Sequence, residues 1–277
     1  DNSLTYSVVS GDTNKVTASV SGSDLTVSFV ANASSTLVYP TWNQLGGDIF
    51  GEGGNDWSGH SVSLSDDGTI VAIGARFNDD AGSNAGHVRV YQYADSSWSQ
   101  LGSDIDGQSG NDWCGSSISL SNNGTILAIG SGRRTTPTGQ YTGYVRVYEY
   151  ANSTWTQLGS NIDGEAANDY SGNSVSLSSD GSIVAIGAWL NDVPDSGHVR
   201  IYQNNSGTWS QIGDDIDGEA NNDHFGVSVS LSGDGSIVAI GATNNGGNGY
   251  NSGHVRIYEN NSGTWSQIGS DIDGEDA

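Results

Sequence analysis

Short carboxylate-rich phrases recur along this chain, and their residue types suit the binding of a hard cation. Each phrase follows a W-x-Q-[LI]-G motif, reads for example D-I-D-G-Q or N-I-D-G-E, and is followed shortly by an Asn-Asp pair. Carboxylate and amide oxygens in a glycine-containing loop are ligands that Ca²⁺ accepts, although the spacing is not that of an EF-hand. The predicted calcium ligands are Asp104, Asp106, Asp112, Asp163, Glu165, Asp169, Asp215, Asp217, Glu219 and Asp223.

The same acids also have a structural interpretation, which the sequence leaves open. Asp and Asn in turns accept hydrogen bonds from nearby backbone N–H groups. An arginine also recurs in every repeat, at Arg89, Arg146, Arg200 and Arg256. We expect these arginines to pair with the loop carboxylates between repeats.

Catalysis finds little support in these residues. Paired carboxylates in every repeat are compatible with a glycosidase, yet an active site is usually a single asymmetric set of groups. Here the acids, histidines and arginines mostly recur with the repeat, and the sequence has no Ser-His-Asp order, phosphate-binding loop or H-E-x-x-H motif. We therefore expect a non-enzymatic protein.

A second group of candidate binding residues lies where the repeats differ from one another. The stretches 76–86, 132–143, 189–197 and 243–253 vary in length and composition, while their flanks stay constant. Variable loops on a constant frame are common recognition sites, although ordinary drift between repeats gives the same pattern. The candidate contact residues are Arg133, Arg134, Tyr141, Trp189 and Tyr250, whose groups suit a glycan or a protein surface.

A tandem repeat must position both groups. Nearly identical phrases, from TWNQLGGDIFGE to TWSQIGSDIDGE, begin about 56 residues apart at Trp42, Trp98, Trp155, Trp209 and Trp265. Four repeats follow from these starts, and a truncated fifth start ends at Ala277. A fixed period of this length indicates a repeat architecture in which neighbouring units bury each other.

Each repeat contains four strand-like runs. SVSLS alternates apolar and polar residues, a D-G or N-G turn follows, IVAIGA is almost wholly apolar, and HVRVYQY precedes the next tryptophan phrase. Alternation and tight glycine turns predict antiparallel β-strands. We predict an all-β fold of tandem four-stranded antiparallel blades, either a β-propeller or an open propeller-like array. A β-solenoid is the rival, but its repeats are usually shorter.

The string D-x-[SF]-G-x-S-V-S-L-S-x-D-G-[ST]-I-V-A-I-G-A, followed by G-H-V-R-V-Y, resembles the FG-GAP repeats of integrin-α-type β-propellers over residues 42–277. Phe225-Gly226 with Ile240-Gly241-Ala242 is the closest copy of the motif within the chain. The resemblance implies a propeller on an extracellular adhesive protein. The calcium signature of that family, D-x-D-x-D-G in the first hairpin, is absent from this sequence.

Residues 1–41 lack the repeat phrase and resemble the end of a cadherin-like or bacterial Ig-like module. A degenerate blade is the alternative, with strands at 4–10, 15–21 and 24–30 completed by the Trp42 strand. The chain therefore divides into a β-rich segment, 1–41, and four FG-GAP-like blades with a truncated fifth start, 42–277. This division leaves a spare fourth strand at each end.

Composition limits the partners. The formal net charge of −24 disfavours binding to nucleic acid, which needs a lysine and arginine footprint. No apolar run is long enough to insert into a membrane, and a single cysteine, Cys114, permits no intrachain disulfide. Sequons, which accept N-glycans in secreted proteins, occur at Asn32, Asn123, Asn152, Asn204 and Asn260.

These observations predict a secreted or cell-surface protein that begins at Asp1 as a processed or truncated product. The expected function is extracellular adhesion or structure, through loops that bind protein or glycan. Two alternatives remain open. One is a calcium-dependent lectin, and the other is a subunit of a surface filament whose open blade edges bind further copies of the chain.

Overall fold

The structure is a computed structural model of the 277-residue chain, and it describes residues 16–21, 24–29, 43–134, 141–191 and 196–275. It divides into two compact units, Asp1–Gln44 and Leu45–Ala277. The described part of the first unit is an antiparallel hairpin of β1 (Val16–Ser21) and β2 (Asp24–Phe29). The degenerate-blade interpretation expected strands close to these, at 15–21 and 24–30, and its further strand at 4–10 lies outside the described residues.

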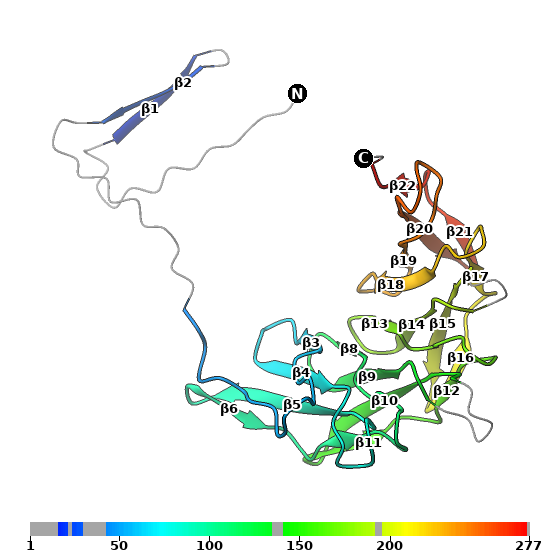
Figure 1. The fold of residues 1–277 in the computed structure, drawn as a ribbon. Coiled ribbons are helices and arrows are strands. Elements are labelled where there is room, and N and C mark those ends of the chain that lie inside the picture. Colours follow the sequence, from blue (N-terminus) through cyan, green and yellow to red (C-terminus); the bar gives the residue numbers. More distant parts are fainter. Residues whose placement is uncertain (1–15, 22–23, 30–42, 135–140, 192–195, 276–277) are drawn as a thin grey trace. The chain divides into compact units, whose positions relative to one another are not determined.

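The second unit consists of four blades, each with four antiparallel strands and a short fifth strand (Figure 1). The first blade contains β3 (Ser61–Leu64), β4 (Ile70–Ala75), β5 (His87–Ala94), β6 (Ser97–Gln100) and β7 (Ile105–Asp106). The second contains β8 (Ser117–Leu120), β9 (Ile126–Ser131), β10 (Tyr144–Ala151), β11 (Thr154–Gln157) and β12 (Ile162–Asp163). The third contains β13 (Ser174–Leu177), β14 (Ile183–Ala188), β15 (His198–Asn205), β16 (Thr208–Gln211) and β17 (Ile216–Asp217). The fourth contains β18 (Phe225–Leu231), β19 (Ile237–Ala242), β20 (His254–Asn261), β21 (Thr264–Gln267) and β22 (Ile272–Asp273). The predicted all-β fold of tandem four-stranded blades is confirmed.

The hairpin between the first two strands of a blade follows directly from its residues. In blade 1 the turn places Gly68 at a φ of 71°, a left-handed value that glycine adopts without strain. The Asp67 carboxylate accepts hydrogen bonds from the Ser65 hydroxyl at 2.7 Å and from the Thr69 N–H at 2.9 Å. Local residues therefore set the register of the hairpin before any neighbouring blade is present.

The outer edge of each blade differs from the prediction. The tryptophan strand was expected to lead into an acidic loop, but residues such as Ile105–Asp106 form the short strand β7, which pairs with the beginning of β5. The Leu101 N–H donates to the Val90 carbonyl and the Gly107 N–H to the Gly86 carbonyl, so the pairing resumes after a bulge. Because Asp and Gly have low β-propensity, the alternation of side chains did not reveal this second piece.

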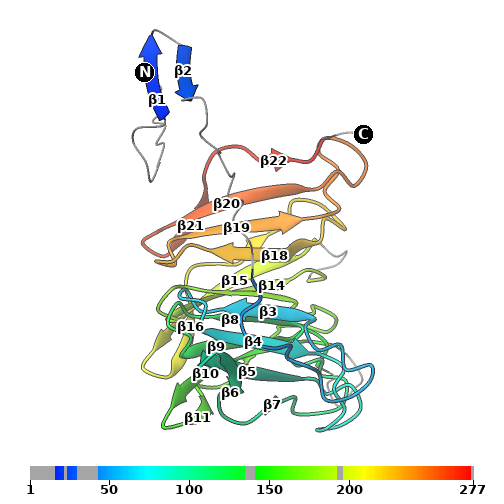
Figure 2. The same ribbon diagram turned by 90° about the vertical axis from the view of Figure 1, so that its left-hand side faces the viewer.

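The blades follow one another along an arc (Figure 1), and β18–β21 lie over β13–β16 in the side view (Figure 2). The inner strands β3, β8, β13 and β18 line the concave side, and the outer strands β6, β11, β16 and β21 the convex side. Apolar side chains form three buried clusters, one between each pair of neighbouring blades. Between blades 1 and 2, for example, Val88 and Val90 share a cluster with Ile118 and Leu120. The core of the molecule therefore lies between blades.

A spare fourth strand was predicted at each end of the repeats, but the one at the C-terminal end is not spare. The last tryptophan phrase forms β21 and β22, the outer edge of blade 4, and is not the start of a further blade. Among the described residues, only the first phrase, described from Asn43, belongs to none of the four blades. Within the described residues, no helix has the length and apolar character needed to cross a bilayer.

Candidate functional site

One acid just before each inner strand orients the loop that leads into the blade. The buried carboxylate of Asp112 accepts the N–H groups of Gln108 and Ser109, both at 2.9 Å, and the Tyr144 hydroxyl at 3.1 Å. Burial raises the pKa of Asp112, and these hydrogen bonds act in the opposite direction. The same acceptor role falls to Asp56, Asp169 and Asp223. Three predicted calcium ligands, Asp112, Asp169 and Asp223, are thus engaged by their own loops.

The other predicted calcium ligands lie at the outer part of the blades. Three of them, Asp106, Asp163 and Asp217, belong to the short strands β7, β12 and β17. Four others, Asp104, Asp215, Glu165 and Glu219, gather around histidines at the start of the third strands. The structure therefore divides the predicted ligands into separate groups.

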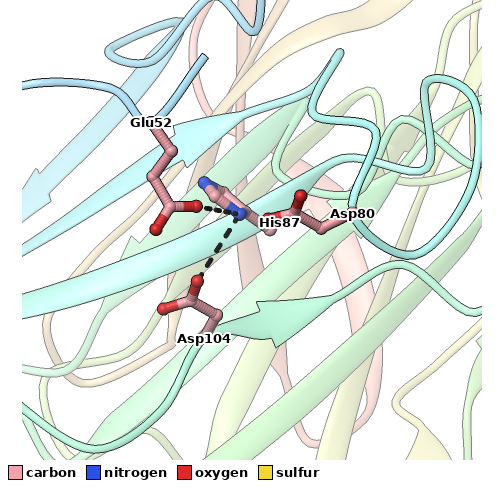
Figure 3. Close-up of side chains that lie close together, drawn as sticks. All are labelled: Glu52, Asp80, His87 and Asp104. Carbon is pink, nitrogen blue, oxygen red and sulfur yellow. Dashed lines mark ion pairs between the residues drawn. The ribbon is translucent and has the colours of Figure 1, made fainter.

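Three clusters of Glu, His and Asp recur in the blades. Each joins a Glu from the loop before the blade, the His that begins the third strand and an Asp from the bulge in the outer strand. The clusters are Glu52–His87–Asp104, Glu165–His198–Asp215 and Glu219–His254–Asp271. Figure 3 shows the first of them, in which Asp80 lies close to the other three residues.

An arginine two residues after each histidine contacts the glutamate of the same cluster. The pairs are Arg89–Glu52, Arg200–Glu165 and Arg256–Glu219. In blades 3 and 4 the arginine also reaches the aspartate, with Nε to Oδ1 distances of 3.1 Å for Arg200–Asp215 and 3.2 Å for Arg256–Asp271. The prediction that the recurring arginines pair with loop carboxylates is confirmed for these three blades.

Blade 2 departs from this pattern at every ionisable position except the arginine. Gln108, Tyr144 and Asn161 replace Glu, His and Asp, and the Asn161 amide donates to Gln108 Oε1 at 3.3 Å. For Arg146 the predicted carboxylate pairing is wrong, because its guanidinium donates to the Asp106 carbonyl at 2.6 Å and to Cys114 Sγ at 3.4 Å. These three replacements leave blade 2 without the Glu-His-Asp cluster.

Aromatic and arginine side chains form a continuous series across the four blades. The Arg76 guanidinium lies 4.9 Å from the Trp57 ring centre and 5.1 Å from that of Trp113. Arg133 lies 4.4 Å from Trp113 and 4.5 Å from Tyr141. Ring contacts continue the series through Tyr141–Tyr170, Tyr170–Trp189 and Trp189–His224. We call this series, together with Phe77, the aromatic ladder.

Four ladder residues occupy the same position in the repeat, directly after the Asn-Asp pair. Their φ angles are 57° for Trp57, 56° for Trp113, 54° for Tyr170 and 57° for His224. Bulky side chains rarely adopt left-handed backbone angles, and such strain collects at sites where a side chain must be held in place. The sequence contains a signal for these residues, since an aromatic ring or imidazole follows every Asn-Asp pair. None of the four was among the predicted contact residues, which were taken from the variable loops.

The predicted contact residues are only partly brought together. Arg133, Tyr141 and Trp189 join the ladder, whereas Arg134 pairs with Asp163 and Tyr250 is exposed outside it. The described sequons lie in or next to turns at the other end of the strands. Asn123 is in the turn after β8 and Asn152 in the turn before β11, whereas Asn204 and Asn260 are the second-to-last residues of β15 and β20. Asn32 lies outside the described residues.

Neighbouring blades are joined by a dipeptide that we call the plug, which lies one residue before an inner strand or at the start of that strand. The plugs at the three internal interfaces are Cys114-Gly115, Ser171-Gly172 and Phe225-Gly226. The Cys114 N–H donates to the Ala85 carbonyl at 2.9 Å, and the Ser61 hydroxyl donates to the Gly115 carbonyl at 2.7 Å. A Cβ at Gly74 would lie 2.4 Å from the Gly115 oxygen, so this approach requires glycine.

The two terminal blades carry the same parts without a partner among the described residues. The plug of blade 1 is Ser58-Gly59, and a Cβ at Gly59 would meet no atom within 4 Å. At the other end, blade 4 has a hollow of about 380 Å³ whose lining includes Ser228, Gly241 and His254. These residues correspond to those that receive the plug in the other blades, and we call this hollow the socket.

Comparison with known proteins supports the repeat assignment. A family model described as FG-GAP repeat matches residues 52–91 and 216–258, which lie mainly in blades 1 and 4. These two stretches confirm the FG-GAP resemblance stated from the sequence. No curated protein matches the chain significantly.

The solved structures that match this chain have little sequence in common with it. A "putative 6-phosphogluconolactonase" from Bacteroides uniformis superposes with a TM-score of 0.54 at 14% identity, over 78% of this chain and 55% of that one. This chain therefore spans little more than half of that protein, and the likeness concerns the fold alone. TolB from Acinetobacter baumannii and hydrazine synthase from Kuenenia stuttgartiensis give TM-scores of 0.44 and 0.46, each at 12% identity and over 75% of this chain, covering 42% and 53% of theirs.

Proposed function

We propose that this protein is a non-enzymatic structural module of the cell exterior, whose copies join end to end through their blades. The observation that carries the proposal is the pair of matching ends, a plug at Ser58-Gly59 on blade 1 and a socket at Gly241 on blade 4. A unit of the same repeat fills the equivalent place at each of the internal interfaces. The occupant that fits is therefore a further unit of the same repeat, and we propose that a second copy of this chain supplies it.

Apolar surface and backbone donors at the two ends support the same contact. Val62 and Leu64 are exposed on blade 1, and Ile268 and Ile272 are exposed on blade 4. Inside the chain the Leu120 N–H donates to the Ser63 hydroxyl at 2.9 Å, and this bond recurs at the next two interfaces. Between two copies, the equivalent hydrogen bond runs from the Leu64 N–H of one copy to the Ser230 hydroxyl of the other.

When two copies meet, two segments compete for the same outer-strand position, and one of them must be displaced. Trp98 donates to the Leu45 carbonyl at 2.8 Å, as Trp155 does to the Leu101 carbonyl. Leu45 therefore lies where the outer strand of a preceding blade lies, yet blade 4 already has such a strand in β21. Since the phrases TWNQLGGDI and TWSQIGSDI are nearly identical, we infer that one replaces the other by strand exchange, which makes assembly slow.

The test is the mass of the purified chain as a function of concentration and time, measured by sedimentation, with electron microscopy of the product. We expect a growing series of oligomers, favoured by salt because the net charge of −24 repels other copies. Gly241→Ala puts a methyl group into the socket, and Leu64→Lys puts a charge on the plug face, so both variants should remain monomeric. Ser99→Lys, on the exposed outer strand β6, is the matched control and should assemble.

A chain that stays monomeric at high concentration and salt contradicts the proposal. So does assembly that both socket and plug variants leave intact. A dimer of fixed size that both variants abolish has a different meaning: the two arcs close on each other as a ring, and the module is a structural unit without being a filament subunit.

Recognition of a glycan is the second candidate function, and the aromatic ladder favours it. Trp57 is 54% exposed at one end of the ladder, and an indole face beside the Arg76 guanidinium suits stacking against a sugar ring. A glycan array probed with the wild type and with Trp57→Ala tests this function. Binding that Trp57→Ala removes supports recognition by the ladder, whereas an array without signal leaves the ladder a contact between blades.

A further inference from the structure

Blade 1 contains a cluster of three carboxylates around one buried imidazole. We propose that Glu52, Asp80, His87 and Asp104 bind a divalent first-row transition-metal ion, in a site that does not depend on assembly of the chain. One ligand atom from each residue lies within 4.8 Å of every other, which is close enough for a shared ion after small side-chain rotations. Figure 3 shows the imidazole between the carboxylates of Glu52 and Asp104.

The burial of the His87 imidazole and its lack of a hydrogen-bond partner in the described part of the chain point to a metal ion independently of the acidic residues. The His87 side chain is 1% exposed, and its Nδ1 has no hydrogen-bond partner among the described residues. That nitrogen is 3.8 Å from Glu52 Oε2 and from Asp104 Oδ2, too far for a hydrogen bond. A buried polar atom normally has a partner, and a metal ion between the three groups supplies one.

The arginine beside the cluster separates blade 1 from blades 3 and 4. In blade 4, Arg256 contacts both Glu219 and Asp271, so the two carboxylates are already neutralised by one guanidinium. In blade 1, Arg89 donates to the Phe50 carbonyl at 2.7 Å and approaches only Glu52, at 3.4 Å. Blade 1 also adds Asp80, which has no counterpart among the described residues around the other two clusters. The blade-1 cluster therefore has an excess of negative charge, which suits a divalent cation.

The donor set indicates the class of metal. Imidazole nitrogen binds Zn²⁺, Fe²⁺ and Ni²⁺ well, and carboxylates extend the range to Mn²⁺, whereas Ca²⁺ is bound through oxygen. One nitrogen with three carboxylates therefore favours a transition metal over Ca²⁺. Glu52 precedes the blade and the other three residues belong to it, so the ion ties the segment around Glu52 to blade 1.

The experiment is calorimetric titration of the full chain, treated with a chelator and dialysed, with Zn²⁺, Mn²⁺ and Ca²⁺ separately. We expect about one equivalent of Zn²⁺ or Mn²⁺ to bind, and Ca²⁺ to bind at least about 10-fold more weakly. The first variant gives blade 1 the residues that blade 2 already contains, Glu52→Gln, His87→Tyr and Asp104→Asn. Its transition-metal affinity should fall at least about 100-fold.

A matched variant makes the same three changes in blade 3, at Glu165→Gln, His198→Tyr and Asp215→Asn, and should bind as the wild type does. Asp80→Asn changes one exposed side chain and should weaken binding without affecting the fold, which guards against a blade-1 variant that fails to fold. The proposal is overturned if the wild type takes up no more Zn²⁺ or Mn²⁺ than the blade-1 variant. It is equally overturned if the blade-3 variant loses the ion, or if Ca²⁺ binds most tightly.

Discussion

The inner strands of blades 1 and 2 have almost the same residues but very different surroundings. Val62 and Leu64 in blade 1 are 64% and 59% exposed, whereas Ile118 and Leu120 in blade 2 are each 8% exposed. Blade 2 packs against blade 1, and no described residue packs in the same way against blade 1 itself. The repeat therefore encodes a contact between blades, and its apolar residues are buried only where the next unit is present.

Blade 4 shows a corresponding difference on the surface that would receive the next blade. Gly130 in blade 2 lies against the Gly172 carbonyl of the next blade, whereas Gly241 in blade 4 faces the socket. Glycine at this position is needed for close packing between blades 2 and 3, but no described neighbour requires it in blade 4. Substitutions at matched positions can therefore separate the stability of the blade from that of its contacts.

The largest effect is expected from alanine at these two glycines. In Gly130→Ala the new Cβ would lie 2.0 Å from the Gly172 oxygen, and the blades must separate to make room. We expect a loss of about 4 kcal/mol in the free energy of unfolding. In Gly241→Ala the new Cβ is near only the Ser228 hydroxyl, which can rotate, so the loss should stay below about 1 kcal/mol.

Urea unfolding at low protein concentration, followed by tryptophan fluorescence, measures both variants. Low concentration keeps the socket of blade 4 empty, so that the monomer alone is compared. Equal losses at Gly130 and Gly241 would mean that the socket is filled in the monomer, and the distinction between interior and terminal blades would fail.

A smaller effect is expected from truncation of the leucine at the end of the inner strand. Leu120→Ala removes a side chain from the cluster between blades 1 and 2 and should cost about 2–3 kcal/mol. Leu64→Ala removes the equivalent side chain where it is exposed, and should cost less than about 0.5 kcal/mol in the monomer. Thermal unfolding of both variants checks the difference, and a similar melting temperature for the two contradicts it.

Sequence alone predicted the four main strands and the hairpin turn of each repeat, but not the short fifth strand after the bulge. The hairpin turn at Asp67 and the pairing of Arg89 with a loop carboxylate follow from short-range pattern or from strict recurrence. The blade fold followed from the same recurrence, because four antiparallel strands per repeat can bury their faces only against each other.

Features that arise between repeats were missed. The aromatic ladder needs Trp57 of one blade and Trp113 of the next on either side of Arg76, and no window of the sequence contains that geometry. The histidines were not among the predicted ligands, yet His87 lies among carboxylates from three separate segments. Recurrence identifies the frame but does not show which copies of a residue have kept an additional partner.

The smallest effect concerns the hairpin turns, which are local and should behave alike in interior and terminal blades. In blade 4, hydrogen bonds from Ser232 and Ser236 lower the pKa of Asp234 to about 2. In blade 3, hydrogen bonds from Ser182 and Ser178 lower the pKa of Asp180. A lowered carboxyl pKa stabilises the folded state above the ordinary pKa of about 4, and this contribution disappears as the pH falls towards the folded-state value.

Blade 2 has Asn123 at this position, and its side-chain oxygen accepts the same hydrogen bond from the Thr125 N–H without a titratable proton. Asp234→Asn and Asp180→Asn should therefore leave the melting temperature at pH 7 nearly unchanged. Each should lessen the fall in melting temperature between pH 5 and pH 2, by similar small amounts, because a group that no longer titrates no longer links unfolding to protons. If only the interior variant changed the acid profile, the turns would depend on neighbouring blades, and the separation of local from inter-blade stability would have to be redrawn.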